Sequence, residues 1–340
     1  MFRYDRQPFR HHQLSECVSG VKTVAKRLCA ISAVVCTQNR SDYLVRCLAA
    51  LERQTLAPDC FEVVVVDNGS KDDTPSVIAS FCERLAHFKR YFEPRPGLSI
   101  ARNSGTRMCA ADIVAFTDDD AEPDPAWLEG LLFRFREGGE SFGIVGGDVI
   151  PVWGAPRPAW LTDQMLRPLS AGLKWSTEAR LARSGEWLIE VNSAYRKSVL
   201  DFVGGFPEKL GRVGDLLLSG DGVVNQLIEM AGFSLFYDPA ILVRHHISAN
   251  RLSREWFRKR SFWQGVTLNR CHRYVLQTAQ TLGLDLPAQR GRRWEEIIVP
   301  TSALAWADLF DENSQEDFSD QLYHLEQLGF FLESQRLVIG

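Results

Sequence analysis

The sequence predicts an α/β fold with a largely parallel sheet flanked by helices. Two continuous β-branched runs, residues 31–36 and 61–66, have the composition of strands that are covered on both faces. A third apolar run, residues 112–116, follows later, and each run precedes a segment in which apolar residues recur at helical spacing. Strand alternating with helix is typical of a sheet whose strands are mostly parallel.

The elements of the first half can be justified in order. Each run ends in a polar segment, after which a helical pattern begins, and Pro75 stands where the first turn of the second helix is expected. The apolar residues that define the helices after the three runs are Leu44, Leu48 and Leu51; Ile78, Phe81, Cys82 and Leu85; and Trp127, Leu128 and Leu131. The first half therefore predicts three consecutive strand–helix units.

The second half is less regular. A Pro- and Trp-rich segment over residues 151–160 predicts a loop over a site. The expected strands are residues 142–150, 187–192, 234–238 and 241–245, and the expected helices are residues 223–228, 254–265, 274–284 and 320–335. These patterns predict a partly disordered lead-in over residues 1–28, a main domain over residues 29–250 and a helical region over residues 251–340.

Composition excludes several classes of protein. The chain has 340 residues, of which 45% are hydrophobic and 24% charged, and a net charge of −4 gives no general attraction to nucleic acid. We find no uncharged apolar run of about 18 residues and no apolar signal core near the N-terminus. Eight cysteines occur without a CxxC pair, which favours a reduced, cytoplasmic protein without disulfides.

Polar side chains follow the three runs where each strand is expected to end. "TQNR" follows Cys36, "DNGSKDDT" follows Val66 and "TDDDA" follows Phe116. Ligands of open α/β sheets bind beyond the carboxyl ends of the strands, so the three segments are expected to meet at one site. Taken singly, "DNGS" is also a good turn and "TQNR" is also a helix cap, and these alternatives stay open.

The three adjacent aspartates after Phe116 favour a divalent cation. Neighbouring carboxylates repel one another, and an isolated trio would raise some of its own pKa values. Mg²⁺ or Mn²⁺ relieves the repulsion, and such cations complete their coordination with water and substrate phosphates. The alternative is a solvated turn.

Four ordered motifs resemble the inverting glycosyltransferases of family 2. They are "VVCTQNR", "VVVVDNGSKDDT", "RPGLSIARNSG" and "FTDDDAEPDPAWL", and the resemblance spans residues 29–265. It implies the GT-A fold, a Rossmann-like mixed sheet flanked by helices, here with a helical C-terminal extension. It also implies a nucleotide-diphospho-sugar donor, with UDP-sugars favoured, and a Mn²⁺ or Mg²⁺ cofactor.

The resemblance also assigns roles to residues of the predicted site. It implies that Asp67 bonds the base, that Asp118 approaches the ribose and that Asp120 ligates the metal. Asp119 is the variable middle position of the "DxD" pattern. The residues that it places near the nucleotide are Thr37, Asn39, Arg40 and Arg102.

The catalytic base is expected after the "GGF" turn. Asp221 aligns with a family acid, whereas Gly222 stands where many relatives carry the second acid, often the base. Asp221 is therefore the candidate base and Asp215 the fallback, while the alternative is that Asp221 only favours a helix N-terminus. His245 is a candidate metal or phosphate ligand, and a structural role for it stays open.

The acceptor side is less defined. Residues 251–263 interleave arginines and Lys259 with aromatic residues. Such a segment could lie on the anionic inner face of the membrane, or pair with a phosphate or with the acidic segment near residue 311. The alternative is an amphipathic helix packed on the main domain. The lack of a clear QxxRW segment and of membrane helices favours transfer of single sugars. The acceptor is then a sugar or a lipid-linked molecule, and the oligomeric state stays open.

Two other functions compete with the transferase. A degenerate transferase would hold a nucleotide sugar without turnover, and Gly222 keeps that alternative open. A dinucleotide-dependent oxidoreductase would require GxGxxG after the first strand, where "TQNR" stands instead.

Overall fold

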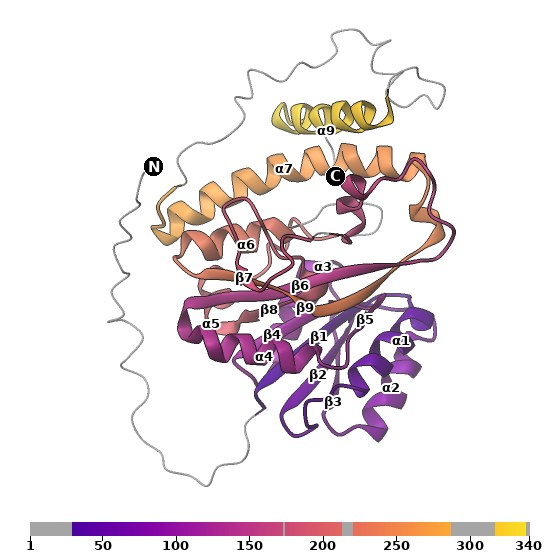
Figure 1. Cartoon of the computed structure of the whole chain (residues 1–340), viewed down its shortest axis with the longest axis vertical. Helices are drawn as coiled ribbons and strands as arrows, with labels where there is room; N and C mark the ends of the chain where they lie inside the picture. The colour runs from indigo at the N-terminus through magenta and orange to yellow at the C-terminus, as the bar shows by residue number, and fades with distance from the viewer. Residues whose placement is uncertain (1–28, 173, 213–219, 287–316, 338–340) are drawn as a thin grey trace.

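One mixed β-sheet forms the centre of the fold in Figure 1, a computed structural model that describes residues 29–172, 174–212, 220–286 and 317–337. The strands are β1 (Ile31–Thr37), β2 (Phe61–Asp67), β3 (Phe88–Phe92), β4 (Ile113–Asp118), β5 (Ala121–Pro123), β6 (Phe142–Trp153), β7 (Arg180–Leu181), β8 (Ser193–Arg196) and β9 (Ser234–Ile247). In the described part of the chain they form one sheet in the order β3-β2-β1-β4-β8-β6-β9-β5, with β7 paired to β9.

Helices cover both faces of this sheet (Figure 1). They are α1 (Ser41–Glu52), α2 (Thr74–Arg84), α3 (Leu98–Met108), α4 (Trp127–Gly138), α5 (Lys197–Phe202), α6 (Asp221–Met230), α7 (Arg254–Leu282) and α9 (Phe318–Ser334). Ile31 and Ala33 of β1 pack in a cluster with α1, α2 and α4, whereas Val34 packs with α3, α5 and α6. Alternate residues of one strand thus face two cores, which explains why the whole β1 run is apolar.

The first four strands in the sheet order bring the predicted polar segments together. β1 is parallel to β2 and to β4, with Thr37 opposite Asp67 and Cys36 opposite Asp118. The carboxyl ends of these three strands therefore lie at one edge of the sheet. The prediction that the segments after the three apolar runs meet is confirmed.

The strand predicted over residues 187–192 is wrong. Glu190–Asn192 forms a 3₁₀ turn, and the strand β8 begins only at Ser193. The side chain of Asn225 on α6 accepts from the Leu188 N–H at 2.9 Å and donates to the Leu188 carbonyl at 3.1 Å. The Asn225 side chain thus pairs with the backbone N–H and carbonyl of Leu188, which in a strand would pair with a neighbouring strand.

The two short strands predicted over residues 234–238 and 241–245 are one strand, β9. Its register with β6 shifts between Gly147, which lies opposite Asp238, and Asp148, which lies opposite Leu242, so residues 239–241 are passed over in the pairing. Asp238 lies opposite Gly147, and its Oδ1 accepts from the Ala240 N–H at 2.9 Å, which holds the bend. The polar residue Asp238 and the residues after it therefore looked like the end of a strand in the sequence, although the strand continues.

Residues 254–265 and 274–284 were predicted as separate helices, but α7 contains the first and nearly all of the second, running through Gly265 to Leu282. A Cβ on Gly265 would overlap the backbone carbonyl of Glu326 in α9, and one on Gly329 of α9 would overlap the carbonyl of Phe262. The two glycines let the helices approach closely, and Figure 1 shows α9 lying along α7. Gly265 is therefore a packing residue and not a helix end.

The basic and aromatic segment of α7 is mainly a packing surface. Phe257, Arg258 and Arg260 are buried, and the Nε of Arg258 donates to the Oε1 of Gln321 in α9 at 2.8 Å. This burial favours the packed helix among the alternatives. In the described ranges, no helix combines the length and apolar character needed to cross a membrane. The predicted lead-in over residues 1–28 lies outside the described residues.

Candidate active site

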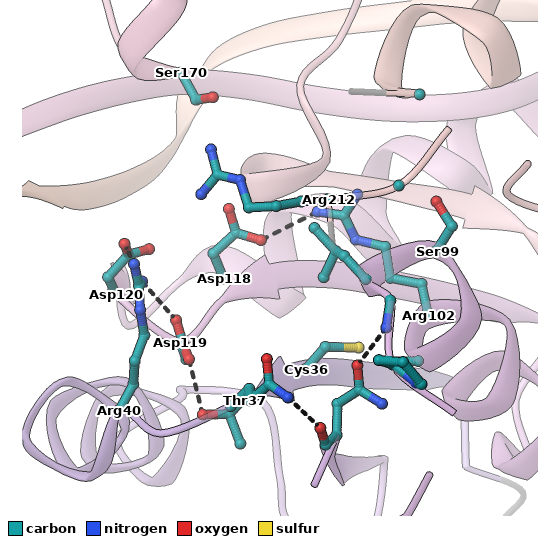
Figure 2. A pocket seen from close by; sticks show the side chains of 18 of the residues that line it. Cys36, Thr37, Arg40, Ser99, Arg102, Asp118, Asp119, Asp120, Ser170 and Arg212 are labelled. Carbon is teal, nitrogen blue, oxygen red and sulfur yellow. Dashed lines mark hydrogen bonds and ion pairs between the residues drawn. The ribbon is translucent and has the colours of Figure 1, made fainter. Parts of the chain in front are cut away.

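A cavity of about 260 Å³ opens at the edge where β1 and β4 end (Figure 2). Its walls come from the ends of these strands, the start of α3, residues 168–170, residues 211–212, the end of β9 and the start of α7. Of the described residues that line it, three are aspartates and five are arginines: Asp118, Asp119 and Asp120, and Arg40, Arg102, Arg212, Arg251 and Arg260. The cavity therefore combines a cluster of carboxylates with a larger number of cations.

Each aspartate has a different environment. Asp119 is buried and accepts from Thr37 Oγ1 at 2.8 Å and from Arg40 Nη1 at 3.0 Å. Asp118 is more exposed and pairs with Arg102 Nη2 at 3.1 Å. Asp120 is buried, and its Oδ2 lies 2.5 Å from Arg40 Nη1. Figure 2 shows Arg40 reaching from below toward Asp119 and Asp120.

Electrostatics distinguish the two buried carboxylates. Burial and the adjacent charge of Asp120 raise the pKa of Asp119, against the opposing effect of Arg40. Burial would also raise the pKa of Asp120, but His245 and Arg40 outweigh it and lower that pKa. Asp120 therefore stays ionised in the pocket.

Asp118, Asp120 and His245 form a group that could hold a cation. One ligand atom from each residue lies within 4.8 Å of the others. Carboxylate oxygens and one imidazole nitrogen suit Mn²⁺, and the carboxylates also suit Mg²⁺. The donor set therefore fits the cation that the sequence predicts, and it adds Asp118, which the resemblance placed at the ribose.

The His245 ring lies between the carboxylate of Asp120 and the backbone carbonyl of Ser170. Its Nδ1 lies 3.3 Å from the Ser170 carbonyl oxygen, and its Nε2 lies 3.2 Å from Asp120 Oδ1. A carbonyl only accepts, so Nδ1 carries a proton and Nε2 faces the carboxylate. When Nε2 is also protonated it donates to that carboxylate, and when it is not, its lone pair would be available to a cation held beside Asp120.

The orientation of His245 is expected to depend on the backbone at Ser170. Ser170 has φ 55° and ψ 42°, a left-handed conformation that β-branched residues strongly disfavour. Ser170→Val should displace the carbonyl and weaken Mn²⁺ binding about 10-fold, whereas Ser170→Gly should bind Mn²⁺ as the wild type does. Calorimetric titration with MnCl₂ measures this, and equal affinities for all three proteins would contradict it.

Other predicted nucleotide residues stabilise the loops around the cavity. Asp67 accepts from the Ser70 N–H at 2.8 Å, and Asn39, at φ 54°, accepts from the Lys71 N–H at 2.7 Å. Neither residue is among those that line the cavity, whereas the neighbouring Asn68 is. Asn68 accepts from the Gly97 N–H at 2.9 Å and so ties the β2 loop to the start of α3.

The structure places the backbone of Asp221 beside the cavity. Asp221 is the first residue of α6, and Gly220, which precedes it, lines the cavity. No heavy atom lies within 4 Å of a Cβ built on Gly222, so this position has room for a side chain. The fallback base, Asp215, lies outside the described residues.

Sequence reasoning missed several residues of the cavity wall. Arg212 was not considered, Asn68 was treated as part of a turn, and Arg251 and Arg260 were noted only as members of a basic segment. The sequence signal for Arg251 and Arg260 was the density of arginines after residue 250, and this signal does not reach Arg212. That density does not separate a residue that faces a ligand from one that packs between helices.

Comparisons with solved structures define the fold. The chain resembles a mannosyltransferase from Pyrobaculum calidifontis, solved with GDP-Man and Mn²⁺, with a TM-score of 0.56 and 18% identity over 90% of this chain and 86% of that one. It also resembles residues 1–349 of TarS from S. aureus, with a TM-score of 0.51 and 16% identity over 90% and 91% of the two chains. The fold is therefore the GT-A fold of glycosyltransferases.

Sequence comparison then gives the family. Residues 32–201 match the model described as glycosyl transferase family 2, and the chain belongs to that family. It is 27% identical over 247 residues to the glucosyl-dolichyl phosphate glucuronosyltransferase of Haloferax volcanii, covering 70% of this chain and 75% of that protein. It is 26% identical over 254 residues to the pre-mycofactocin glycosyltransferase of Mycobacterium tuberculosis, covering 73% of this chain and 49% of the relative.

Proposed function

We propose that this family 2 glycosyltransferase is a metal-dependent, inverting enzyme that moves a single sugar from a nucleotide-diphospho-sugar to an acceptor hydroxyl. The observation that carries the proposal is the grouping of Asp118, Asp120 and His245 in a cavity that arginines also line. Carboxylates and imidazole hold a cation, whereas guanidinium groups bind phosphate oxygens. A metal-bound diphosphate is a ligand that requires both.

Residues at the ends of β1, β2 and β4 would bind the donor. Asp118, Asp120 and His245 would hold the cation, which when bound neutralises negative charge that develops on the departing diphosphate. Thr37 and Arg40 keep Asp119 and Asp120 in place beneath it. Arg102, Asn39 and Asp67 would bind or order the nucleotide, as the family resemblance implies.

Asp221 would accept the proton of the acceptor hydroxyl as that oxygen attacks the sugar. Its position at the first residue of α6, directly after a residue of the cavity wall, supports this role. Attack from the side opposite the departing diphosphate, in one displacement, inverts the configuration at the sugar carbon. A correctly placed base of this kind contributes about 10²- to 10⁴-fold to the rate.

The relatives support a class of donor and a class of acceptor. The solved structures include one with GDP-Man and Mn²⁺ and one with UDP, GalNAc and Mn²⁺, so a UDP-sugar or a GDP-sugar is the expected donor. The Haloferax relative is named for a dolichyl phosphate-linked substrate, which supports a lipid-linked acceptor in polysaccharide or glycoconjugate synthesis. Such a role would place the protein in the cytoplasm, at the inner face of the membrane.

A calorimetric panel tests the donor proposal. UDP, GDP, ADP, CDP and TDP are titrated into the wild-type protein with MnCl₂ and with EDTA. We expect one nucleotide to bind tightly and to lose its affinity in EDTA, since a cation held by the carboxylates would neutralise the charge of the diphosphate. Binding of no nucleotide, or equal binding in EDTA, would contradict the proposal.

A nucleotide-sugar-binding protein without turnover is the second candidate. Gly222, which occupies a position with room for a side chain, favours it, because many relatives carry an acid there. Both candidates predict metal-dependent nucleotide binding. Release of the nucleoside diphosphate from the sugar donor on addition of an acceptor separates them, since only the enzyme turns over.

A further inference from the structure

The cations of the cavity are not all neutralised by its carboxylates. Arg40 pairs with Asp119 and Asp120, and Arg102 pairs with Asp118. Arg212 and Arg251 also line the cavity, yet neither forms an ion pair with another described residue. Positive charge therefore remains on the wall after the aspartates have been paired.

Arg251 is the more constrained of these two arginines. Its Nε is buried and has no hydrogen-bond partner among the described residues, and its guanidinium carbon lies 5.1 Å from the centre of the Trp256 ring. Burial lowers the pKa of Arg251 to about 10, Asp120 opposes this shift, and the positive charges of Arg212 and Arg40 add to it. An arginine in this environment is destabilised until an anion reaches it.

The position of Arg251 is fixed relative to the candidate metal ligands. Ala121 of β5 pairs with His245 of β9, and the His246 N–H donates to the Asp120 carbonyl at 2.8 Å. The chain then turns through the short helix Ala249–Arg251, where the Arg251 N–H donates to the Ser248 carbonyl at 3.0 Å. One short segment after His245 thus carries both a metal ligand and the arginine.

We propose that Arg251 binds the diphosphate of the donor and stabilises the nucleoside diphosphate as it departs. This inference rests on the proposed function and assigns a further residue to its site. Arg260, which is buried and lines the same cavity from α7, lies nine residues further on and extends the cationic wall. The cation and Arg251 would then share the negative charge of one ligand.

A stability measurement separates this role from a packing role. Arg251→Met removes a desolvated charge and keeps an apolar chain beside Trp256. The ligand-free variant is therefore expected to have a Tm equal to or above that of the wild type, because functional residues of this kind are held at a cost in stability. Its affinity for Mn²⁺ alone should be unchanged or higher, since a nearby positive charge is removed.

Ligand binding by the same variant is the decisive test. Inorganic pyrophosphate, UDP and GDP, each with saturating MnCl₂, are titrated into the wild type, Arg251→Met and Arg244→Met. Arg244 lies in β9, next to His245, is exposed, and is not among the residues that line the cavity. We expect Arg251→Met to weaken pyrophosphate and diphosphate binding about 10- to 100-fold, as loss of a charged hydrogen bond does, and Arg244→Met to have no effect.

The outcomes distinguish this inference from the proposed function. If UDP or GDP binds wild type and Arg251→Met equally, the role of Arg251 is overturned and the donor class stands. If only pyrophosphate binds and the variant loses it, Arg251 binds phosphate and the nucleotide donor is wrong. If the wild type binds neither pyrophosphate nor any nucleotide of the panel, both are overturned. A lower Tm together with weaker Mn²⁺ binding would assign Arg251 a structural role instead.

Discussion

Replacing Asp120 with asparagine is expected to abolish metal-dependent nucleotide binding. Asp120 is the aspartate whose low pKa keeps it ionised, and one of its oxygens lies 3.2 Å from His245 Nε2. Asparagine keeps the shape of the side chain but removes the charge that a hard cation requires. Mutation of a residue that only hydrogen-bonds a metal ligand lowers metal affinity about 10- to 100-fold. Loss of the ligand Asp120 itself should lower Mn²⁺ affinity by more than this.

Two measurements check this prediction, and a matched control accompanies them. Titration with MnCl₂ reports the cation directly, and titration with the nucleotide chosen by the wild-type panel reports the donor. Asp112→Asn is the control, because Asp112 is exposed and lies just before β4, at the opposite end of that strand from the site. Undiminished Mn²⁺ binding by Asp120→Asn would show that the aspartates after β4 serve another purpose.

The thermal stability of Asp120→Asn should also change. Arg40 keeps its contact with Asp119, so the guanidinium is not left without a partner. Burial and the charge of Asp120 raise the pKa of Asp119, so the ionised form of Asp119 is disfavoured in the folded protein. Removal of the Asp120 charge makes ionised Asp119 less unfavourable. We expect a small change in Tm, whereas a large decrease would mean that lost binding reflects lost folding.

Replacing Asp221 with asparagine is expected to lower turnover about 10²- to 10⁴-fold while nucleotide affinity stays unchanged. Asparagine cannot accept the acceptor proton, but the donor site at the ends of β1, β2 and β4 is intact. If Asp221 only interacts with the N-terminus of α6, the variant should lose up to about 1 kcal/mol of stability and keep its turnover. Measured kcat and Tm therefore separate the two roles.

The neighbouring glycine offers a rescue experiment for Asp221. Gly222 has open space around the position of a Cβ, and an acid in the first turn of a helix is favourable. We expect Asp221→Asn with Gly222→Asp to recover part of the turnover and to show the pH dependence of a carboxylate base. Full activity of Asp221→Asn alone would exclude Asp221 as the base and direct attention to Asp215.

The parallel half of the sheet was predictable because its signals are local. The β1 and β2 runs are buried on both faces, so nearly every residue is apolar, and a short window of sequence is sufficient to recognise them. β3 and α3 were not predicted as elements. β3 is an edge strand with exposed residues, and α3 buries Ser99, Arg102 and Ser104 instead of a regular apolar stripe.

The sequence by itself determined the α/β class, the meeting of three polar segments at one edge, and the three aspartates. The class and the aspartates come from local patterns, and the meeting follows because parallel strands bring their carboxyl ends to one edge of a sheet. Only the tertiary structure decided that Ser170 orients His245, that Gly265 lies inside one long helix, and that Arg251 lines the same cavity as Asp120. The physical reason is that these contacts join residues that are far apart in the chain, and their geometry depends on how strands and helices pack.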